Sequence, residues 1–356
     1  MAAPRVLIAG AGPVGLTAGL ALLRAGCVVE IVDARAEGEN DDDPRAIALA
    51  HGSALILDRL DVALPESATP IRRIEISQQH GFGRASIDAS EHRLDALGYV
   101  VRLGDLTRAL RLKCRATRMM FRYGTTLPDT PEAEVALVVH AEGSAGDCAL
   151  VRNYGQTAVV TEARADHAPS HTAFERFTPA GPLAVLPLGT GHSVVWCMEP
   201  DRAEVLSSCA EPVFIAALNQ ATRYAGITWQ SVGTRTAFAL KLLRRAQSDI
   251  GRQVWIGNAA QTLHPVAGQG LNLGLRDAFE LGVSLADGVD EARLSRWRAR
   301  RRMDRETIVR LTDGYVSLFS NDLGLLRFGR GLGLALVNAL PPLKGLVARG
   351  MMFGMR

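Results

Sequence analysis

The pattern of apolar and polar positions at the start of the chain predicts a strand, a helix and a second strand. Residues 6–9 form a short apolar run, residues 16–24 have the leucine and alanine spacing of a helix, and residues 28–32 form a second apolar run. A G-x-G-x-x-G pattern lies directly after the first run, Gly26 can cap the helix, and Asp33 ends the second run. This arrangement predicts a dinucleotide site, with a diphosphate at the start of the helix and ribose hydroxyls on Asp33. The acid argues for FAD or NAD over NADP, and a tight turn without a nucleotide is the alternative.

A second strand-to-helix connection lies in the last third of the chain. An apolar run leads into a Gly-Asn pair at residues 254–258, a loop with Pro265 follows, and a G-Q-G triplet at residues 268–270 precedes a predicted helix from about Leu271. Glycines let the backbone come close to a flat ligand. The start of a helix offers unpaired N–H groups and a partial positive charge, which suit a ligand edge that becomes anionic. A glycine-rich turn without a ligand is the alternative.

Between these two connections the pattern changes to short alternating runs. Residues 70–101 and 154–199 alternate like strands separated by glycine and polar turns, which predicts an antiparallel sheet formed in two visits of the chain. Residues 45–60 are predicted as a helix that follows an acidic, solvated loop at residues 36–44. Residues 111–153 give the weakest pattern.

The C-terminal part predicts helices with two kinds of surface. Residues 292–312 are rich in arginine and predict a basic helix, for which a solvated surface is favoured over contact with an acidic partner or anionic lipid. Residues 323–355 are apolar and glycine-rich, with scattered Arg and Lys. This tail either packs against the rest of the protein or contacts a membrane.

Composition narrows the class of protein. The 356 residues are 47% hydrophobic and 22% charged, with a net charge of +3, which predicts a large core and gives no sign of nucleic-acid binding. The five cysteines are scattered and form no C-x-x-C pair, so neither a zinc site nor a disulfide framework is expected. We expect no signal peptide and no transmembrane run of about 18 apolar residues. These features favour a cytoplasmic protein.

The second connection carries a family motif. Residues 257–261 read GNAAQ, and Pro265 and the G-Q-G triplet follow. This stretch resembles the second FAD-contacting motif of the single-component flavin-dependent aromatic hydroxylases, which reads G-D-A-A-H, then P, then G-Q-G. Asn258 stands in place of the usual Asp, and Gln261 in place of the usual His. The whole run is most similar to the ubiquinone-biosynthesis hydroxylases, specifically the polyprenyl-methoxyphenol hydroxylase branch.

Other motifs of that family occur elsewhere in the chain. Residues 45–49 resemble its R-x-I-A-L motif, Arg102 matches an Arg before a D-L-x-x-x-L helix, and Glu142 stands where its A-D-G motif has Asp. The resemblance implies contacts with the cofactor from both connections and both arginines: Gly10, Gly12, Pro13, Gly15, Asp33, Arg45, Arg102, Gly257, Asn258, Pro265, Gly268, Gln269, Gly270, Leu271 and Asn272. Four positions match family residues near the substrate, although each could equally be sheet core: Phe177, Pro179, Gly181 and Leu183. His264 is a weak candidate for a proton relay, with a structural role favoured.

The resemblance also implies a fold. We expect an α/β protein with a Rossmann-type FAD-binding domain, interrupted by an antiparallel-sheet substrate domain and followed by a helical C-terminal tail. The FAD-binding domain is predicted at residues 1–69, 102–153 and 244–290. The substrate domain is predicted at residues 70–101 and 154–243, and the helical segment at residues 291–356.

The function implied is an FAD-dependent monooxygenase that hydroxylates a polyprenyl phenol in ubiquinone biosynthesis. In this family NAD(P)H reduces the flavin, O2 adds to its C4a atom as a hydroperoxide, and the phenol ring takes one oxygen atom. The cofactor carries this chemistry, so no metal and no catalytic base are assigned. The alternatives are an FAD-dependent reductase of the same fold and a non-catalytic FAD- or lipid-binding member of a biosynthetic complex. The resemblance further implies contact with other ubiquinone-biosynthesis proteins and a peripheral place on the inner face of the membrane.

Overall fold

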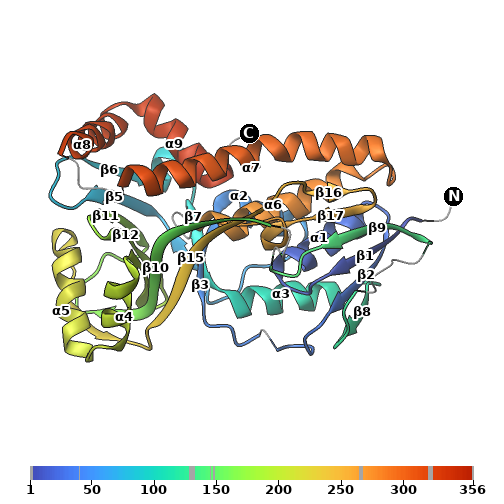
Figure 1. Ribbon diagram of the computed structural model, residues 1–356, viewed down its shortest axis with the longest axis horizontal. Coiled ribbons are helices and arrows are strands. Elements are labelled where there is room, and N and C mark those ends of the chain that lie inside the picture. Colours follow the sequence, from blue (N-terminus) through green and yellow to red (C-terminus); the bar gives the residue numbers. More distant parts are fainter. Residues whose placement is uncertain are drawn as a thin grey trace.

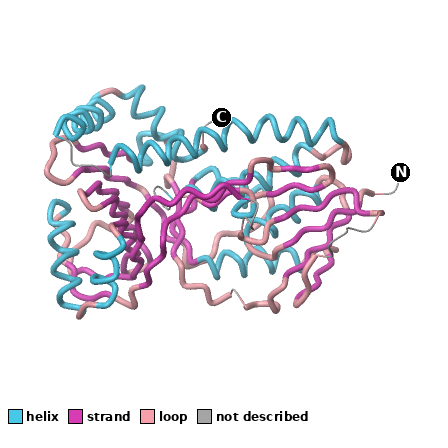
Figure 2. Tube along the Cα trace, viewed as in Figure 1, coloured by secondary structure: helices cyan, strands magenta, loops and turns pink. Residues whose placement is uncertain are grey.

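The computed structural model describes residues 3–39, 41–127, 133–144, 146, 149–263, 268–319 and 324–354. Strands form two large groups joined by long central strands, with helices on the outside (Figure 2). The N-terminal group occupies one end of the molecule, and α7 (Glu291–Phe319) runs above both groups (Figure 1). The predicted α/β fold is confirmed.

The first sheet forms around the N-terminal glycine-rich turn. Its strands, in spatial order, are β16 (Asp249–Ile250), β17 (Gln253–Trp255), β9 (Val135–His140), β1 (Arg5–Ala9), β2 (Val28–Asp33) and β8 (Met120–Tyr123). All neighbours pair in parallel except β16 with β17. Parallel strands buried on both faces read as continuous apolar runs, which explains why β1 and β2 were visible in the sequence.

Three helices accompany this sheet, and the predicted first helix is confirmed. They are α1 (Pro13–Arg24), α3 (Leu103–Arg115) and α6 (Gln269–Ser284). Pro13 suits the first turn of α1 because the missing N–H would have no partner there. Gly282 lets α6 approach α1 closely, since a Cβ at this position would lie 2.6 Å from Ala21.

The predicted helix over residues 45–60 is wrong in its first part. Residues 46–50 form β3 (Ala46–Ala50), and only then does α2 (His51–Arg59) begin. β3 pairs antiparallel with β7 (Gly98–Arg102), which also pairs with β4 (Thr69–Ile71). Pairing with a distant strand therefore overrides the local helical tendency.

The second sheet contains strands from both predicted visits. In spatial order they are β18 (Gln261–Thr262), β15 (Thr236–Arg245), β10 (Ala149–Ala165), β13 (Gly191–Met198), β12 (Gly181–Leu188), β11 (Thr172–Thr178), β5 (Arg73–Gln78) and β6 (Arg84–Asp88), with β14 (Trp229–Val232) beside β10. Its pairings are antiparallel except that of β11 with β5, which joins the two visits. The predicted domain boundaries after residues 153 and 243 fall inside β10 and β15. These two paired strands run side by side from the first sheet region into the second (Figure 1).

One face of the second sheet is covered by α4 (Pro200–Ser208) and α5 (Glu211–Thr222). The apolar residues of this core include Phe174, Leu183, Trp196 and Phe214. The opposite face carries the other residues of the same strands, because side chains alternate along a strand.

Helix α7 contacts α6 through buried ion pairs, which corrects the expectation of a solvated basic surface for some of its arginines. Asp277 on α6 is fully buried, and its carboxylate accepts from Arg301 Nε at 2.7 Å and Arg305 Nη2 at 2.9 Å. Arg276 pairs with Asp304 in the same network at 3.0 Å. Part of the arginine-rich pattern therefore fastens α7 to the protein and does not face solvent.

The chain ends in α8 (Gly324–Ala339) and α9 (Pro341–Phe353). Helix α9 packs into a core with Ile87 and Leu97, where Ala348 and Met352 are almost fully buried. Helix α8 lies over β5 and β6 (Figure 1), with Leu334 and Val337 against the sheet. Within the described residues no single helix is long and apolar enough to cross a membrane; segments of α8 and α9 reach that hydropathy only together, across a 99° bend.

Candidate cofactor and substrate site

A cavity of about 800 Å³ lies where the two sheets meet. One end, here called the cofactor end, is lined by the glycine-rich connections, including Gly12, Pro13, Gly257 and residues 268–272. The other end, here called the chamber, is lined by the second sheet and by α9. Its size is that of a ligand pocket rather than a packing defect.

The two outer glycines of the first motif pack tightly, whereas the central one leaves space. A Cβ at Gly10 would lie 2.5 Å from Ala141 O, and one at Gly15 would lie 1.9 Å from Gly10 O. A Cβ at Gly12 would meet no heavy atom within 4 Å, and Gly12 lines the cavity. Gly10 and Gly15 therefore shape the turn, and Gly12 leaves open the space beside the α1 N-terminus that a diphosphate needs.

Asp33 lies at the end of β2 and is 6% exposed. Its carboxylate accepts a hydrogen bond from Ala11 N at 2.7 Å and from the backbone and side chain of Arg35. Burial raises the pKa of Asp33, but these hydrogen bonds outweigh burial and leave the pKa below its usual value. The group is thus an anionic acceptor, as a ribose-binding acid must be.

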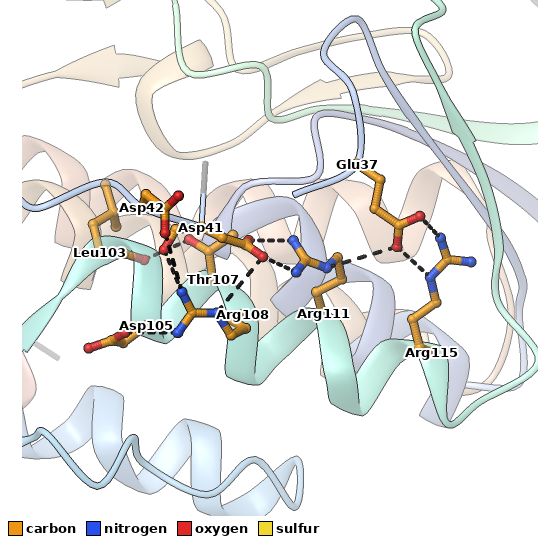
Figure 3. Close-up of polar contacts among 9 residues, drawn as sticks. All are labelled: Glu37, Asp41, Asp42, Leu103, Asp105, Thr107, Arg108, Arg111 and Arg115. Atoms are coloured by element: carbon orange, nitrogen blue, oxygen red, sulfur yellow. Dashed lines mark hydrogen bonds and ion pairs between the residues drawn. The ribbon is translucent and has the colours of Figure 1, made fainter. Parts of the chain in front are cut away.

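The acidic loop before β3 has mostly exposed residues, in agreement with its prediction as a solvated loop, and ion pairs also hold it against α3. Arg111 forms an ion pair with Asp41, and Arg115 pairs with Glu37 at 2.6 Å (Figure 3). Arg108 Nη2 donates to Asp41 O at 2.9 Å. The spacing of these arginines, one turn of α3 apart, places them in a row along the loop.

This loop leads to Asp43 and Arg45, which line the cavity with Arg35. Arg45 donates to both carboxylate oxygens of Asp43, with Nη2 to Oδ2 at 2.6 Å. The hydrogen bonds that Arg45 donates to the Asp43 carboxylate raise the pKa of Arg45. The predicted cofactor residue Arg45 is therefore at the cavity, at the start of β3 rather than of a helix.

The second motif forms the remaining part of the cofactor end. Asn258, Gly268, Gln269, Gly270 and Leu271 line the cavity with Gly257. The side chain of Asn258 is exposed, and a Cβ at Gly270 would meet nothing within 4 Å. A ligand can therefore lie directly on the α6 N-terminus, where N–H groups lack helical partners.

Asn272 has a different position from that of Asn258. It is 1% exposed; its Oδ1 accepts from Ala50 N at 2.8 Å, and its Nδ2 donates to Ala48 O at 2.8 Å. Asn272 therefore joins α6 to the end of β3 and shapes the cavity from behind. The predictions for His264 and Pro265 lie outside the described residues.

Arg102 does not line the cavity. It ends β7, forms an ion pair with Glu162 and donates to Pro44 O at 3.2 Å. Its contact with Pro44 lies next to the Asp43–Arg45 pair, so Arg102 supports the loop from outside the cavity. Its assignment to the cofactor stays a prediction.

The chamber wall is the face of the second sheet opposite α4 and α5. Its residues come from β5, β11, β12 and β13: Ile74, Ile76, Ala173, Glu175, Phe177, Ala184, Leu186 and Val195. Of the four predicted substrate residues, only Phe177 is among them. Leu183 is 1% exposed in the core behind the sheet, and Gly181 (φ 143°) lies against Cys197 O at a turn. Pro179, in the same turn, does not line the cavity.

Two contributions to the chamber were not assigned from the sequence. Glu175 lies on the same face of β11 as Ala173 and Phe177, and the two-residue repeat of the strand could have predicted this position. Residues of α9, including Val347 and Met351, close the chamber on another side. Nothing local in the apolar tail indicated that it would form a wall of this cavity.

Comparison with known proteins agrees with this geometry. The family model described as FAD binding domain matches residues 4–145 and 149–312. Ubiquinone hydroxylase UbiL of Rhodospirillum rubrum is 32% identical, over 98% of this chain and 89% of the relative. The 3-demethoxyubiquinol 3-hydroxylase of Escherichia coli is 28% identical, over 92% of this chain and 93% of the relative.

Solved structures of flavin-dependent enzymes share the fold. The p-nitrophenol 4-monooxygenase PnpA of Pseudomonas putida has a TM-score of 0.77 at 17% identity, over 99% of both chains. HpxO of Klebsiella pneumoniae, solved with FAD and uric acid, has a TM-score of 0.74 at 17% identity, over 99% of this chain and 96% of the other. The match to the FAD binding domain model makes FAD the cofactor that fits the open space at Gly12 and Gly270, here called the glycine cradle. Taken together, the motifs, the cradle and the relatives show that the chain belongs to the FAD-binding domain family and, within it, to the ubiquinone-biosynthesis hydroxylases, which are flavin-dependent monooxygenases.

Proposed function

We propose that the protein hydroxylates the ring of a polyprenyl phenol during ubiquinone biosynthesis, with FAD as cofactor, NAD(P)H as reductant and O2 as the source of oxygen. The observation that carries the proposal is one continuous cavity whose cofactor end has an open glycine cradle and whose chamber is almost entirely apolar. The relatives from Rhodospirillum rubrum and Escherichia coli, a ubiquinone hydroxylase and a 3-demethoxyubiquinol 3-hydroxylase, support this pathway. An apolar chamber suits an aromatic ring with a hydrocarbon chain.

The residues of this chain have two tasks in such a reaction, and the cofactor has a third. Gly12, Gly270 and the N-termini of α1 and α6 would hold the diphosphate and the flavin edge. The apolar wall would keep water away from the reacting atoms. When bound, reduced FAD supplies the activation of O2 that no protein side chain can supply.

Product analysis tests the proposal against the two alternatives. The FAD-loaded protein is given NAD(P)H and a short-chain prenyl phenol, and the product mass is measured. A gain of one oxygen atom supports the hydroxylase. Consumption of NAD(P)H with a product that lacks added oxygen supports a reductase, and bound FAD without turnover supports a non-catalytic role; either result contradicts the proposal.

We also propose that α8 touches the bilayer surface from which such a substrate comes. A ridge of exposed apolar side chains runs along α8, with its members four residues apart. They are Phe328, Leu332 and Leu336, which are 58%, 46% and 43% exposed. Phe82 extends this ridge, with its ring 5.2 Å from that of Phe328. The inner side of α8 covers the strands that form the chamber wall, so the ridge lies on the outside of the chamber.

Substitution on the ridge tests this contact without removing the helix. Leu332→Glu and Leu336→Glu together should weaken binding to liposomes at unchanged FAD content, because a carboxylate on the apolar face opposes burial of that face at the boundary between headgroups and acyl chains. The matched control is Met303→Glu on α7, a 68% exposed apolar residue away from the ridge. Equal liposome binding by the ridge variant and wild type would contradict the proposal.

A further inference from the structure

Glu175 is the one acidic residue on the chamber wall formed by the described strands. It lies in the middle of β11, opposite Ile76 of β5 on one side and Ala184 of β12 on the other. Both of these neighbours also line the cavity. An acid has no packing reason to lie there, because a carboxyl in apolar surroundings is costly unless it has a partner.

The carboxyl of Glu175 has no hydrogen-bond partner for its Oε1 atom among the described residues, although that atom is buried. Buried polar side chains are usually satisfied, so the Oε1 atom of a carboxyl that lines a cavity can bind a polar group of a ligand there. The titratable groups that act on it electrostatically are Cys197 of β13 and Tyr224. Arg176, the next residue, lies on the other face of the sheet, 3.7 Å from the ring of Tyr224.

Burial governs the protonation state of this group. It raises the pKa of Glu175 to about 8. Burial also raises the pKa of both Cys197 and Tyr224, so neither supplies a charge near neutral pH. Near pH 7 the side chain is therefore mainly a neutral acid, which has an O–H donor as well as an acceptor oxygen.

We propose that Glu175 is the polar anchor of the chamber, which hydrogen-bonds the ring oxygen of the phenol and fixes the orientation of the ring relative to the flavin. This inference rests on the proposed function and adds a residue to it. The wall around Glu175 consists of aliphatic and aromatic side chains that hold a ring in place by shape alone. A single directional contact is what distinguishes one rotation of the ring from another, and hence one ring carbon from its neighbours.

The direction of the hydrogen bond gives a specific test. A neutral carboxyl can donate to a phenol or to its methyl ether, whereas a carboxylate can only accept from the phenol. Binding of the methyl ether to the wild-type protein should therefore weaken as the pH rises through about 8, and binding of the phenol should weaken less. In Glu175→Gln, which keeps a donor and an acceptor without titrating, this difference should disappear.

The experiment measures dissociation constants of a short-chain prenyl phenol and its methyl ether on FAD-loaded protein, from changes in flavin absorbance, together with the position of hydroxylation. Glu175→Leu should bind the phenol about tenfold more weakly, the scale of one buried hydrogen bond, and should give a mixture of products. Glu175→Gln should stay within about threefold of wild type. The matched control is Glu75→Leu, the same change on the opposite face of β5.

Each outcome decides a different question. Wild-type affinity and a single product in Glu175→Leu would overturn the anchor while leaving the hydroxylase intact. Loss of FAD or of folding in Glu175→Leu, together with an unchanged pH difference in Glu175→Gln, would assign Glu175 to the scaffold and also overturn the anchor. A wild-type protein that binds the phenol but never adds oxygen to it would overturn the proposed function instead.

Discussion

The change Gly12→Val tests whether FAD binding can be lost while the fold stays intact. Gly12 has φ −80° and ψ 177°, an extended conformation that valine adopts readily. Because an added Cβ would meet no heavy atom within 4 Å, the side chain would extend into the cofactor end of the cavity. The fold should therefore survive, and FAD should be excluded.

The expected effect can be estimated from the linkage between binding and stability. A ligand present at 100 times its Kd stabilises the folded state by about 2.7 kcal/mol. For a chain of this length the unfolding entropy is about 0.75 kcal/mol per kelvin, so FAD should raise the wild-type Tm by about 4 °C. Gly12→Val should show the Tm of wild-type apoprotein and no rise when FAD is added.

Two further variants make the measurement decisive. Gly15→Val should lower the Tm of the apoprotein itself, because its Cβ would lie 1.9 Å from Gly10 O. Gly314→Val, on α7 with open space around it, should behave as wild type. The assay is thermal unfolding of apoprotein with and without FAD, combined with flavin absorbance of the purified protein. Full FAD content in Gly12→Val would refute the assignment of the cradle.

Three other changes test the cofactor end, the ion pairs between α6 and α7, and the acidic loop. Asn258→Asp adds a negative charge beside the flavin and should lower its reduction potential; a redox titration with no shift or an upward one would count against this position. Asp277→Asn leaves two buried guanidinium groups short of a partner and should destabilise the protein by about 3–5 kcal/mol, whereas Asp290→Asn, on the surface, should have little effect; denaturant unfolding compares them. Burial raises the pKa of Asp277, but the charges of Arg305 and Arg301 outweigh burial and leave the pKa below its usual value. The stabilising contribution of Asp277 is therefore present above the unfolded pKa of about 3.9 and is lost as the pH falls from that value through the lower pKa of the folded state. Arg111→Met releases Asp41 and should weaken FAD binding in a fluorescence titration, and unchanged affinity would show that the loop needs no clamp.

Sequence patterns were sufficient to predict those elements whose neighbours in space are also their neighbours in sequence. The strand, turn and helix from Arg5 to Arg24 follow each other in sequence and in space, so their order and boundaries could be predicted. The same holds for the start of α6, apart from a shift of two residues to Gln269. In each case the glycines mark places where the backbone itself makes the close contact.

The predictions from sequence missed features where contacts with a distant segment decide the structure. Residues 46–50 have helical composition but pair with β7, about 50 residues later. The basic pattern of α7 does not show that Arg301 faces inward, because an ion pair with Asp277 is visible only when α6 and α7 are packed together. The clamp between Asp41 and Arg111 is another such pairing.

The chamber is the part of the site that the sequence could least predict, because three distant segments form it. Strand β5 contributes one edge, β11 to β13 contribute the centre, and α9 closes it. Because Met352 is 4% exposed and lines this cavity, deletion of the apolar tail would open the chamber as well as remove the ridge on α8. A truncated protein that fails to bind membranes would therefore leave substrate binding and membrane contact confounded. Substitutions on the exposed side of α8 avoid this confusion, since they change the surface and leave the wall intact.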